Sequence, residues 1–447
     1  MKQLLICNAK IVNEGHIVEG DVLIEGGRIA AVGNGFASRA ANVIDAEGRY
    51  LLPGMIDSQV SFCEPGMTVV ADIASESCAA IAGGVTSYLD LPDAVQGTSS
   101  PDQISEKQKL AQGRSRANYG FYFGAIRDNI DLIPSLSLKQ ACAVSVFLGG
   151  DGADPRLLDD PEVVEQVFAR SPLLVTAHCE DMPTILENEE SYRSIYADNI
   201  PLEFHPIIRS DEACALSTEF AISLAKRHET RLHLMQVSSA REMDLLSDDA
   251  DEQQITAAVG AAFLHFSDAD YEAKGNLLKS YPSIKSEEDR ASLIQGLMES
   301  RLDMVNSGHN PRDLQQKQSR SYFDTPAGMP LVQHGLLTML ENYHDGIFSL
   351  EFIAEKTSHS VANRFDIIER GFIREGYWAD LVLADVEQGQ VVTESNSLSR
   401  CGWTPFDGYR FRSVIAATIV NGELVWADGK LKDTAPVGMA LEYDRSA

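Results

Sequence analysis

The sequence predicts a (β/α)8 barrel of the TIM type, with a small composite β-sandwich formed by the N- and C-terminal segments. Two observations predict this fold. Strand-like and helix-like segments alternate over residues 53–365, and both ends of the chain contain mainly strand-like segments. A barrel of this kind usually takes about 250 residues before insertions, so a chain of 447 residues has room for a second, smaller unit. We therefore expect the barrel over residues 53–365 and the sandwich over residues 1–52 and 366–447.

Each end of the chain carries a hairpin signal. Gly26-Gly27 separates two strand-like segments near the N-terminus, and Asn421-Gly422 separates two more near the C-terminus. Dipeptides of this kind favour the tight turns that join antiparallel strands. Neither end is long enough to bury a sheet by itself, so we expect the two ends to share one sandwich.

The middle of the chain supplies the barrel. Its candidate strands cover residues 85–91, 120–124, 143–148, 173–177, 231–237 and 302–306, and its candidate helices cover residues 71–82, 210–227 and 286–300. A doubly wound open sheet is the alternative, but no G-x-G-x-x-G turn follows the first strand. In a barrel, chemistry takes place at the C-terminal ends of the strands. We therefore look for site residues there.

Composition and charge narrow the class of protein. The chain has 37 Lys and Arg against 66 Asp and Glu, a formal charge of −29. Such an acidic surface repels phosphate backbones, which argues against nucleic acid and anionic membranes as partners. The sequence contains no run of 18 apolar residues, so we expect no membrane span. The N-terminus lacks the features of a signal peptide. The seven cysteines show no C-x-x-C spacing, which is typical of reduced thiols, and we expect a cytoplasmic protein.

A series of short motifs runs through nearly the whole chain. The first is PGMID at residues 53–57, followed by EPG at residues 64–66. The others are AGGVTS at 82–87, AHCED at 177–181, HPIIRS at 205–210, FSDADY at 266–271, PLVQH at 330–334, RGFIREG at 370–376 and CGWTPF at 401–406. Together these motifs resemble those of the dihydroorotase family in the amidohydrolase superfamily. The resemblance implies a barrel enzyme that hydrolyses a cyclic amide with two zinc ions. The zinc ions would activate a water molecule, and an Asp would transfer the proton to the leaving nitrogen.

The resemblance also implies where the zinc ligands and the catalytic Asp should lie. The matching positions are Gln59 and Ser61 for an H-x-H pair, Ser145 for a carboxylated Lys that bridges the metals, His178 and Gln236 for two further His, and Gly308 for the Asp. Amide and hydroxyl groups are poor zinc ligands, and a serine cannot form the bridging carbamate. His178 is the single remnant ligand, so we expect the metal site and the catalytic residue to be lost and no cofactor to bind.

The matching substrate pocket is altered as well. Cys63 stands where the family has an Arg that binds a carboxylate, and Asp93 stands where it has an Asn. Arg312 replaces a His, whereas His309 is kept. Replacing a cation by a thiol and an amide by a carboxylate weakens the attraction for an anionic substrate. We therefore expect a vestigial pocket.

Other polar residues have simpler interpretations. We expect His178 to be a hydrogen-bonded core residue at a strand end and His233 to point away from the pocket. Glu180 and Asp181 are expected to cap a loop or helix, and Arg209 to belong to the charged start of a helix.

The first functional hypothesis is a non-catalytic, dihydroorotase-like protein that acts as a structural or regulatory partner in pyrimidine biosynthesis. A homodimer is expected, and the resemblance suggests aspartate carbamoyltransferase or an active dihydroorotase paralogue as partners. The alternative is a working zinc-dependent dihydroorotase that converts dihydroorotate to N-carbamoyl-aspartate. Its site would be rebuilt around His178, His309, Asp93 and His265. A small-molecule sensor is a third possibility, but no particular residue supports it.

Overall fold

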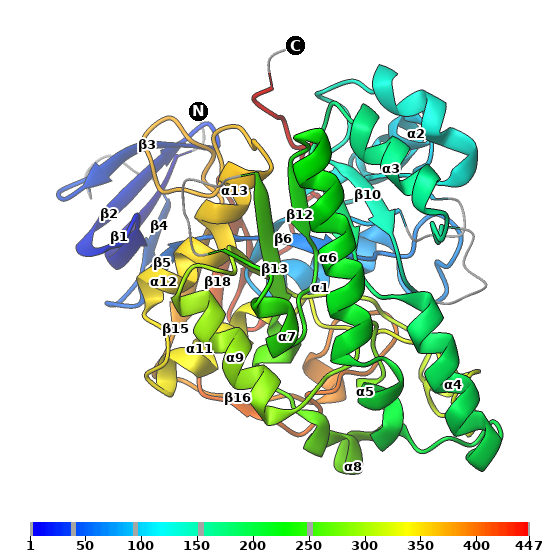
Figure 1. Ribbon diagram of the computed structural model, residues 1–447. Coiled ribbons are helices and arrows are strands. Elements are labelled where there is room, and N and C mark those ends of the chain that lie inside the picture. The colour runs from blue at the N-terminus through cyan, green and yellow to red at the C-terminus, as the bar shows by residue number, and fades with distance from the viewer. Residues whose placement is uncertain (1–2, 37–41, 93–96, 151–155, 248–253, 446–447) are drawn as a thin grey trace.

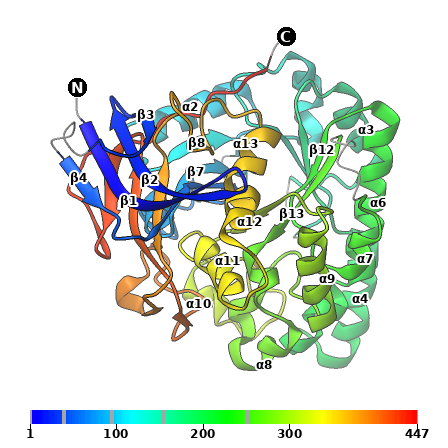
Figure 2. The same cartoon turned by 90° about the vertical axis from the view of Figure 1, so that its left-hand side faces the viewer.

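A barrel of parallel strands, covered on its outside by helices, forms the centre of the molecule (Figure 1). This computed structural model describes residues 3–36, 42–92, 97–150, 156–247 and 254–445. The sheet of the first strands lies at one side of the barrel, and the helices of the middle of the chain lie on the opposite side (Figure 2). The predicted barrel is therefore confirmed.

Two parallel sheets make the barrel wall, in the orders β6-β7-β8 and β9-β10-β11-β12-β13-β14. Their bounds are β6 Met55–Val60, β7 Val85–Asp90, β8 Asn118–Phe121, β9 Phe123–Gly124, β10 Val144–Phe147, β11 Val175–His178, β12 Leu232–Leu234, β13 Ile255–Gly260 and β14 Met304–Asn306. The two sheets meet where the Ser61 amide donates to the His309 carbonyl at 2.7 Å. Strand β13 was not predicted, because its ITAAVG sequence is rich in small residues.

Helices follow the barrel strands along the chain. Their bounds are α1 Ile73–Ala82, α2 Pro101–Ala111, α3 Pro161–Arg170, α4 Met182–Tyr196, α5 His205–Ile208, α6 Asp211–His228, α7 Ala240–Met243, α8 Tyr271–Lys274, α9 Glu287–Met298, α10 Leu314–Lys317, α11 Gly335–His344, α12 Leu350–Ala354 and α13 Ser360–Arg364. The three predicted helices match α1, α6 and α9 closely. Their starts are fixed by Asp72, Ser210 and Ser286, whose side chains accept from backbone amides of the first turn.

The two ends of the chain form one nine-stranded sheet. Its strands are β1 Gln3–Asn13, β2 His16–Glu25, β3 Arg28–Gly33, β4 Asn42–Asp45, β5 Tyr50–Pro53, β15 Leu381–Asp385, β18 Val414–Val420, β19 Glu423–Ala427 and β20 Lys430–Leu431. Strand β5 joins the two ends, since it pairs with β1 on one side and β15 on the other. Both predicted hairpin turns have positive φ at their two central residues: 60° and 88° at Gly26 and Gly27, 50° and 77° at Asn421 and Gly422.

The last residues of the chain return to the barrel. Tyr119 of β8 forms a parallel bridge with Ala440, and the Gly438 amide donates to the Ser115 carbonyl at 3.0 Å. The segment 366–447 therefore contacts the barrel as well as the terminal sheet. The domain boundaries proposed from the sequence stay a prediction.

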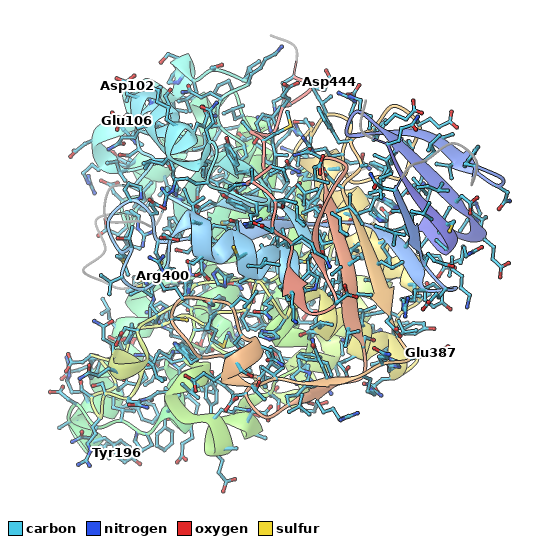
Figure 3. All side chains as sticks on the ribbon, turned by 180° about the vertical axis from the view of Figure 1, so that it is seen from behind. Asp102, Glu106, Tyr196, Glu387, Arg400 and Asp444 are labelled. Atoms are coloured by element: carbon cyan, nitrogen blue, oxygen red, sulfur yellow. The ribbon has the colours of Figure 1, made fainter. Side chains whose placement is uncertain are left out.

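The acidic side chains are spread over the surface. Exposed carboxylates project from α2, at Asp102 and Glu106, and from other parts of the molecule, at Glu387 and Asp444 (Figure 3). Within the described residues, no helix is both long and apolar enough to cross a membrane.

Candidate functional site

A cavity of about 360 Å³ opens at the C-terminal ends of the barrel strands. Four of the six positions matched to metal ligands and catalytic Asp line it: Gln59, His178, Gln236 and Gly308. Gln59 lies in β6 and His178 ends β11, whereas the other two follow β12 and β14. The fold thus brings together residues that are far apart in the sequence, at the end of the barrel where chemistry is expected.

Three carboxamides bond to one another on the inner side of this cavity. The Gln59 amide donates to the Gln236 side-chain carbonyl at 3.3 Å, and the Asn306 amide donates to the Gln59 side-chain carbonyl at 3.3 Å. Asn306 also donates to the Met235 backbone carbonyl at 2.9 Å. We refer to Gln59, Gln236 and Asn306 as the amide network. Sequence reasoning missed Asn306, which carries no motif signal of its own.

Gly308 leaves room for the amide network. Its φ is +64°, and a Cβ atom at this position would lie 2.5 Å from Nε2 of Gln236. That distance is too short for van der Waals contact, so a side chain at 308 would force Gln236 to move. The absence of a side chain at Gly308 and the presence of Gln236 beside it therefore fit each other sterically.

The remaining hydroxyl and thiol positions are buried. Ser145 lies in β10, and its Oγ has no hydrogen-bond partner among the described residues. Ser61 Oγ lies 3.8 Å from Sγ of Cys63. Cys63 is 1% exposed and does not line the cavity in the described structure. A buried neutral thiol cannot bind a carboxylate as a guanidinium does.

His178 belongs to a buried ionic cluster at the edge of the cavity. Its Nε2 lies 3.0 Å from Glu180 Oε2, and the same oxygen accepts from Nη1 of Arg209 at 2.6 Å. Burial alone would raise the pKa of Glu180, but Arg209 and His178 outweigh it and hold the pKa at about 2. Asp181 caps α4, as expected, by accepting from the Thr184 amide at 3.0 Å. Arg209 lies directly before the N-cap of α6, as the sequence indicates, but its side chain is 1% exposed.

Both ring nitrogens of His309 lie close to polar groups of the protein. Its Nδ1 accepts from the Leu331 and Val332 amides at 3.0 and 3.1 Å, and its Nε2 lies 3.1 Å from Glu76 Oε2. The ring therefore carries its proton on Nε2 when neutral. Burial raises the pKa of Glu76, but His309 and Ser399 outweigh this effect and lower it. Both nitrogens of His309 thus have partners within the protein.

The other pocket candidates divide into three cases. Arg312 lines the cavity, and its Nε donates to the Ala327 carbonyl at 2.7 Å. Asp93 lies outside the described residues. His265 was wrongly placed in the alternative site, because its ring packs against Phe406 and Tyr409 at centroid distances of 5.1 and 4.9 Å, away from the cavity. His233 points away as expected, with Nδ1 bonded to Thr256 Oγ1 at 2.9 Å.

The residues at the matched positions do not fit a zinc centre. Zinc sites in proteins use three or four ligands drawn from Cys, His, Asp and Glu. Here the side-chain oxygens of Gln59 and Gln236 already accept hydrogen bonds, and Nε2 of His178 faces Glu180. Glu180 is itself paired with Arg209. Within the described ranges, no three His, Cys, Asp or Glu side chains are grouped so that they could hold a metal.

Comparisons with known proteins find relatives named as cyclic amidohydrolases that match almost the whole chain. It is 27% identical over 446 residues to an allantoinase from Bacillus velezensis, covering 98% of this chain and 97% of the relative. It is also 27% identical over 456 residues to a dihydroorotase from Methanosarcina acetivorans, covering 99% and 96%. No protein-family model matches the sequence.

Solved structures show the same fold. The L-hydantoinase (dihydropyrimidinase) of Arthrobacter aurescens superposes with a TM-score of 0.94 at 21% identity, covering 99% of this chain and 100% of that one. The dihydropyrimidinase of Brevibacillus agri gives 0.89 at 22% identity, covering 99% and 100%. The two solved structures establish the barrel fold, and the relatives share similarity over almost the whole chain. The chain is therefore dihydroorotase-like: it is similar over almost its whole length to allantoinases and dihydroorotases, and it shares its fold with hydantoinases.

Proposed function

We propose that this chain is a non-catalytic member of the cyclic amidohydrolases that has lost its binuclear zinc site and catalytic Asp. The observation that carries the proposal is the amide network, which stands where the family's metal ligands are expected. The Gln59 amide donates to Gln236 and its side-chain oxygen accepts from Asn306, so both groups of Gln59 are bonded without a metal, and Gly308 supplies no acid or base. Hydrolysis of a cyclic amide needs an activated water and a proton carrier, and these side chains provide neither.

The role that we propose is a structural or regulatory one in pyrimidine biosynthesis, as a partner of aspartate carbamoyltransferase or of an active dihydroorotase. Whole-length similarity to a dihydroorotase supports this role. Co-purification of the tagged chain from its native cells tests it, with identification of bound proteins by mass spectrometry. Recovery of neither enzyme would contradict the proposed role but leave the loss of catalysis untouched.

Catalysis is tested directly by incubating the purified chain with zinc and dihydroorotate, allantoin or hydantoin. The expected result is no turnover above that of the buffer. The alternative function, a working cyclic amidohydrolase, gains support from the open cavity beside His178 and His309. Turnover that disappears on substituting His178 would favour that alternative and refute ours.

A restored variant sharpens the test. It carries five substitutions that return the family's residues: Gln59→His, Ser61→His, Ser145→Lys, Gln236→His and Gly308→Asp. We expect this variant to bind zinc, because the motifs and the barrel strands around these positions match those of the family. The matched control keeps the first four substitutions but retains Gly308, and it should bind zinc without gaining turnover, since the proton carrier would be missing. Zinc binding by the unmodified chain equal to that of the restored variant would contradict the proposal.

A further inference from the structure

The turn between β1 and β2 contacts the barrel helices at one histidine. The end of this hairpin, at Glu14 and Gly15, lies against α12 and α13 (Figure 2). The Glu14 amide donates to Nε2 of His359 at 3.1 Å, and Oδ1 of Asn13 accepts from the Ile373 amide at 2.9 Å. We refer to Asn13, Glu14, His359 and Ile373 as the turn contact. It bonds the terminal sheet to the helices that cover the barrel.

The hydrogen bonds of His359 fix its protonation state. Its Nδ1 donates to the Gly371 carbonyl at 2.6 Å, whereas its Nε2 accepts from the Glu14 amide. An imidazole that donates from one nitrogen and accepts at the other is neutral. The ring also stacks on Phe372, with a centroid distance of 4.4 Å and an angle of 7° between the planes, and the residue is 1% exposed. The contact therefore fits the neutral ring.

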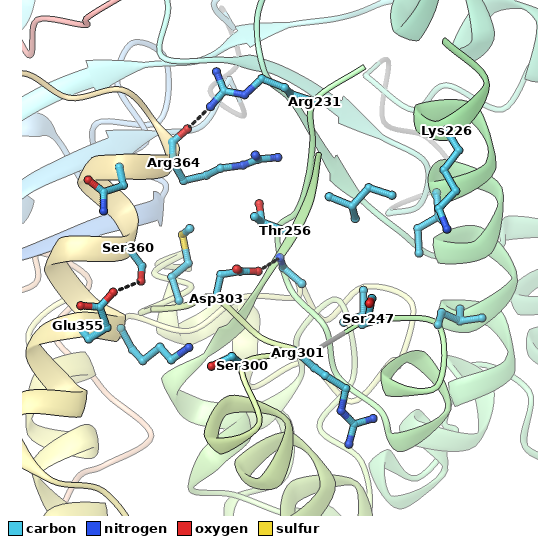
Figure 4. A pocket seen from close by; sticks show the side chains of 18 residues that line it. Lys226, Arg231, Ser247, Thr256, Ser300, Arg301, Asp303, Glu355, Ser360 and Arg364 are labelled. Carbon is cyan, nitrogen blue, oxygen red and sulfur yellow. Dashed lines mark hydrogen bonds between the residues drawn. The ribbon is translucent and has the colours of Figure 1, made fainter. Parts of the chain in front are cut away.

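An unusual helical turn positions the ring. Residues Glu355–His359 form a π-helix between α12 and α13. Turns of this kind are rare and are often found at functional sites. Ser360 Oγ donates to Glu355 at 3.0 Å, and both side chains line a cavity on one face of this helix (Figure 4). His359 does not line that cavity in the described structure, and it contacts the β1–β2 turn instead.

Three charged side chains act on His359 from different segments. Glu355, on its own helix, and Glu14, on the turn, favour a proton on the ring, whereas Arg374 disfavours one. Glu14 is itself bonded to Arg374 Nε at 3.1 Å. Burial outweighs the two carboxylates and lowers the pKa of His359. Strands β6 and β14 also pack against this helix, and their one charged residue, Asp57, accepts from backbone amides.

We propose that the turn contact is a proton-sensitive switch, in which protonation of His359 releases the β1–β2 turn from the barrel helices. A proton on Nε2 would face the Glu14 amide, so two N–H groups would oppose each other in place of the hydrogen bond. In the released state the ring reaches water, where the pKa of a histidine is about 6.5. Acid therefore favours release: the contact is fully stable above about pH 6.5 and weakens as the pH falls below that value.

Hydrogen exchange of the full-length chain, followed by mass spectrometry at about pH 7.5, 6.5 and 5.5, tests the proposal. Exchange of the peptides that contain Glu14 is divided by the intrinsic amide rate at each pH, which gives a protection factor. Protection of these peptides should fall about ten-fold between the highest and the lowest pH, because the released state takes up a proton that the bound state excludes. The β18–β19 hairpin, at the other side of the terminal sheet, is the internal reference, and its protection should fall less.

Two variants assign the effect to one ring. His359→Gln places a side chain here that takes up no proton in this range of pH. Its protection factor should not depend on pH, whatever its value at the highest pH. His16→Gln is the matched control, since His16 begins β2 in the same hairpin but is exposed. This control should keep the ten-fold fall.

Three results would overturn the proposal. The first is protection of the Glu14 peptides that does not change with pH in the unmodified chain, a measurement that needs no variant. The second is a fall that persists in His359→Gln, because another group would then be the one that titrates. The third is an equal fall in the β18–β19 hairpin, which would mean that acid loosens the whole chain and not the turn contact.

Discussion

The two ends of the barrel compensate buried charge in different ways. At the C-terminal end, Glu180 pairs with Arg209 at 2.6 Å, and Asp90 pairs with Lys107 at 2.9 Å. At the N-terminal end, Lys356 donates to a backbone carbonyl, and Asp303 accepts from a backbone amide. At the first end the two carboxylates pair with cations, and the amides of the network bond to one another. At the second end Lys356 and Asp303 bond to backbone groups.

The largest effect is expected from breaking the ion pair at the C-terminal end. Glu180→Gln leaves Arg209 buried without its carboxylate, which should lower the free energy of unfolding by about 3–5 kcal/mol. Chemical denaturation measures this loss. Asp160→Asn is the matched control, since it breaks the exposed pair with Arg127 and should cost less than about 1 kcal/mol. Equal losses in the two variants would contradict the account of the C-terminal end.

Lowering the pH should cause part of the same loss in the free energy of unfolding. The pKa of Glu180 is about 2 in the folded chain, below the value of about 4.3 in an unfolded chain. Its contribution to stability is therefore complete above about pH 4.3 and is lost as the pH falls towards 2. Unfolding curves between these limits should show a component, on the order of 3 kcal/mol, that Glu180→Gln lacks. A variant with the same acid dependence as the unmodified chain would show that Glu180 is not the group that titrates.

A smaller effect is expected where Gly308 faces the amide network. Gly308→Ala should cost about 1–2 kcal/mol for the left-handed backbone, and more because the new Cβ displaces Gln236. Gly113→Ala is the control, since Gly113 has a φ of +71° but nothing within 4 Å of its Cβ position. The difference between the two variants measures the contribution of the displaced amide. No difference would mean that Gln236 moves without cost.

The smallest effect is expected at the N-terminal end. Lys356→Met removes a buried ammonium group whose pKa is lowered by burial, so the relief should offset the lost hydrogen bond to Leu302. The free energy of unfolding should stay within about 1 kcal/mol of that of the unmodified chain. A loss as large as that of Glu180→Gln would show that both ends of the barrel are equally well compensated.

Much of the fold could be predicted from local sequence signals. Hairpin dipeptides such as Asn421-Gly422 and helix caps such as Ser286 act within a few residues, so the sequence around them is sufficient. Strand β13 was missed because its alanines give no strong apolar run. Pairing of β5 with β15 joins segments more than 300 residues apart, and the argument that found it was that neither end could bury a sheet alone.

The candidate site was harder to predict, because its contacts are not local. Alignment with the family's motifs located Gln59, Gln236 and Gly308. Nothing in the sequence indicates that the Asn306 amide donates to Gln59. Arg209 does precede a helix, but its buried bond to Glu180 could not be predicted, because the two residues lie 29 positions apart. His265 was misplaced for the same reason, since its aromatic neighbours come from residues 406 and 409.

The zinc content of the purified chain tests the central claim most directly. The protein is expressed with added zinc, washed without chelator, and measured by elemental mass spectrometry. The account predicts well under one zinc ion per chain, because one imidazole among amides and hydroxyls cannot hold the metal. One or two tightly held zinc ions per chain would contradict it.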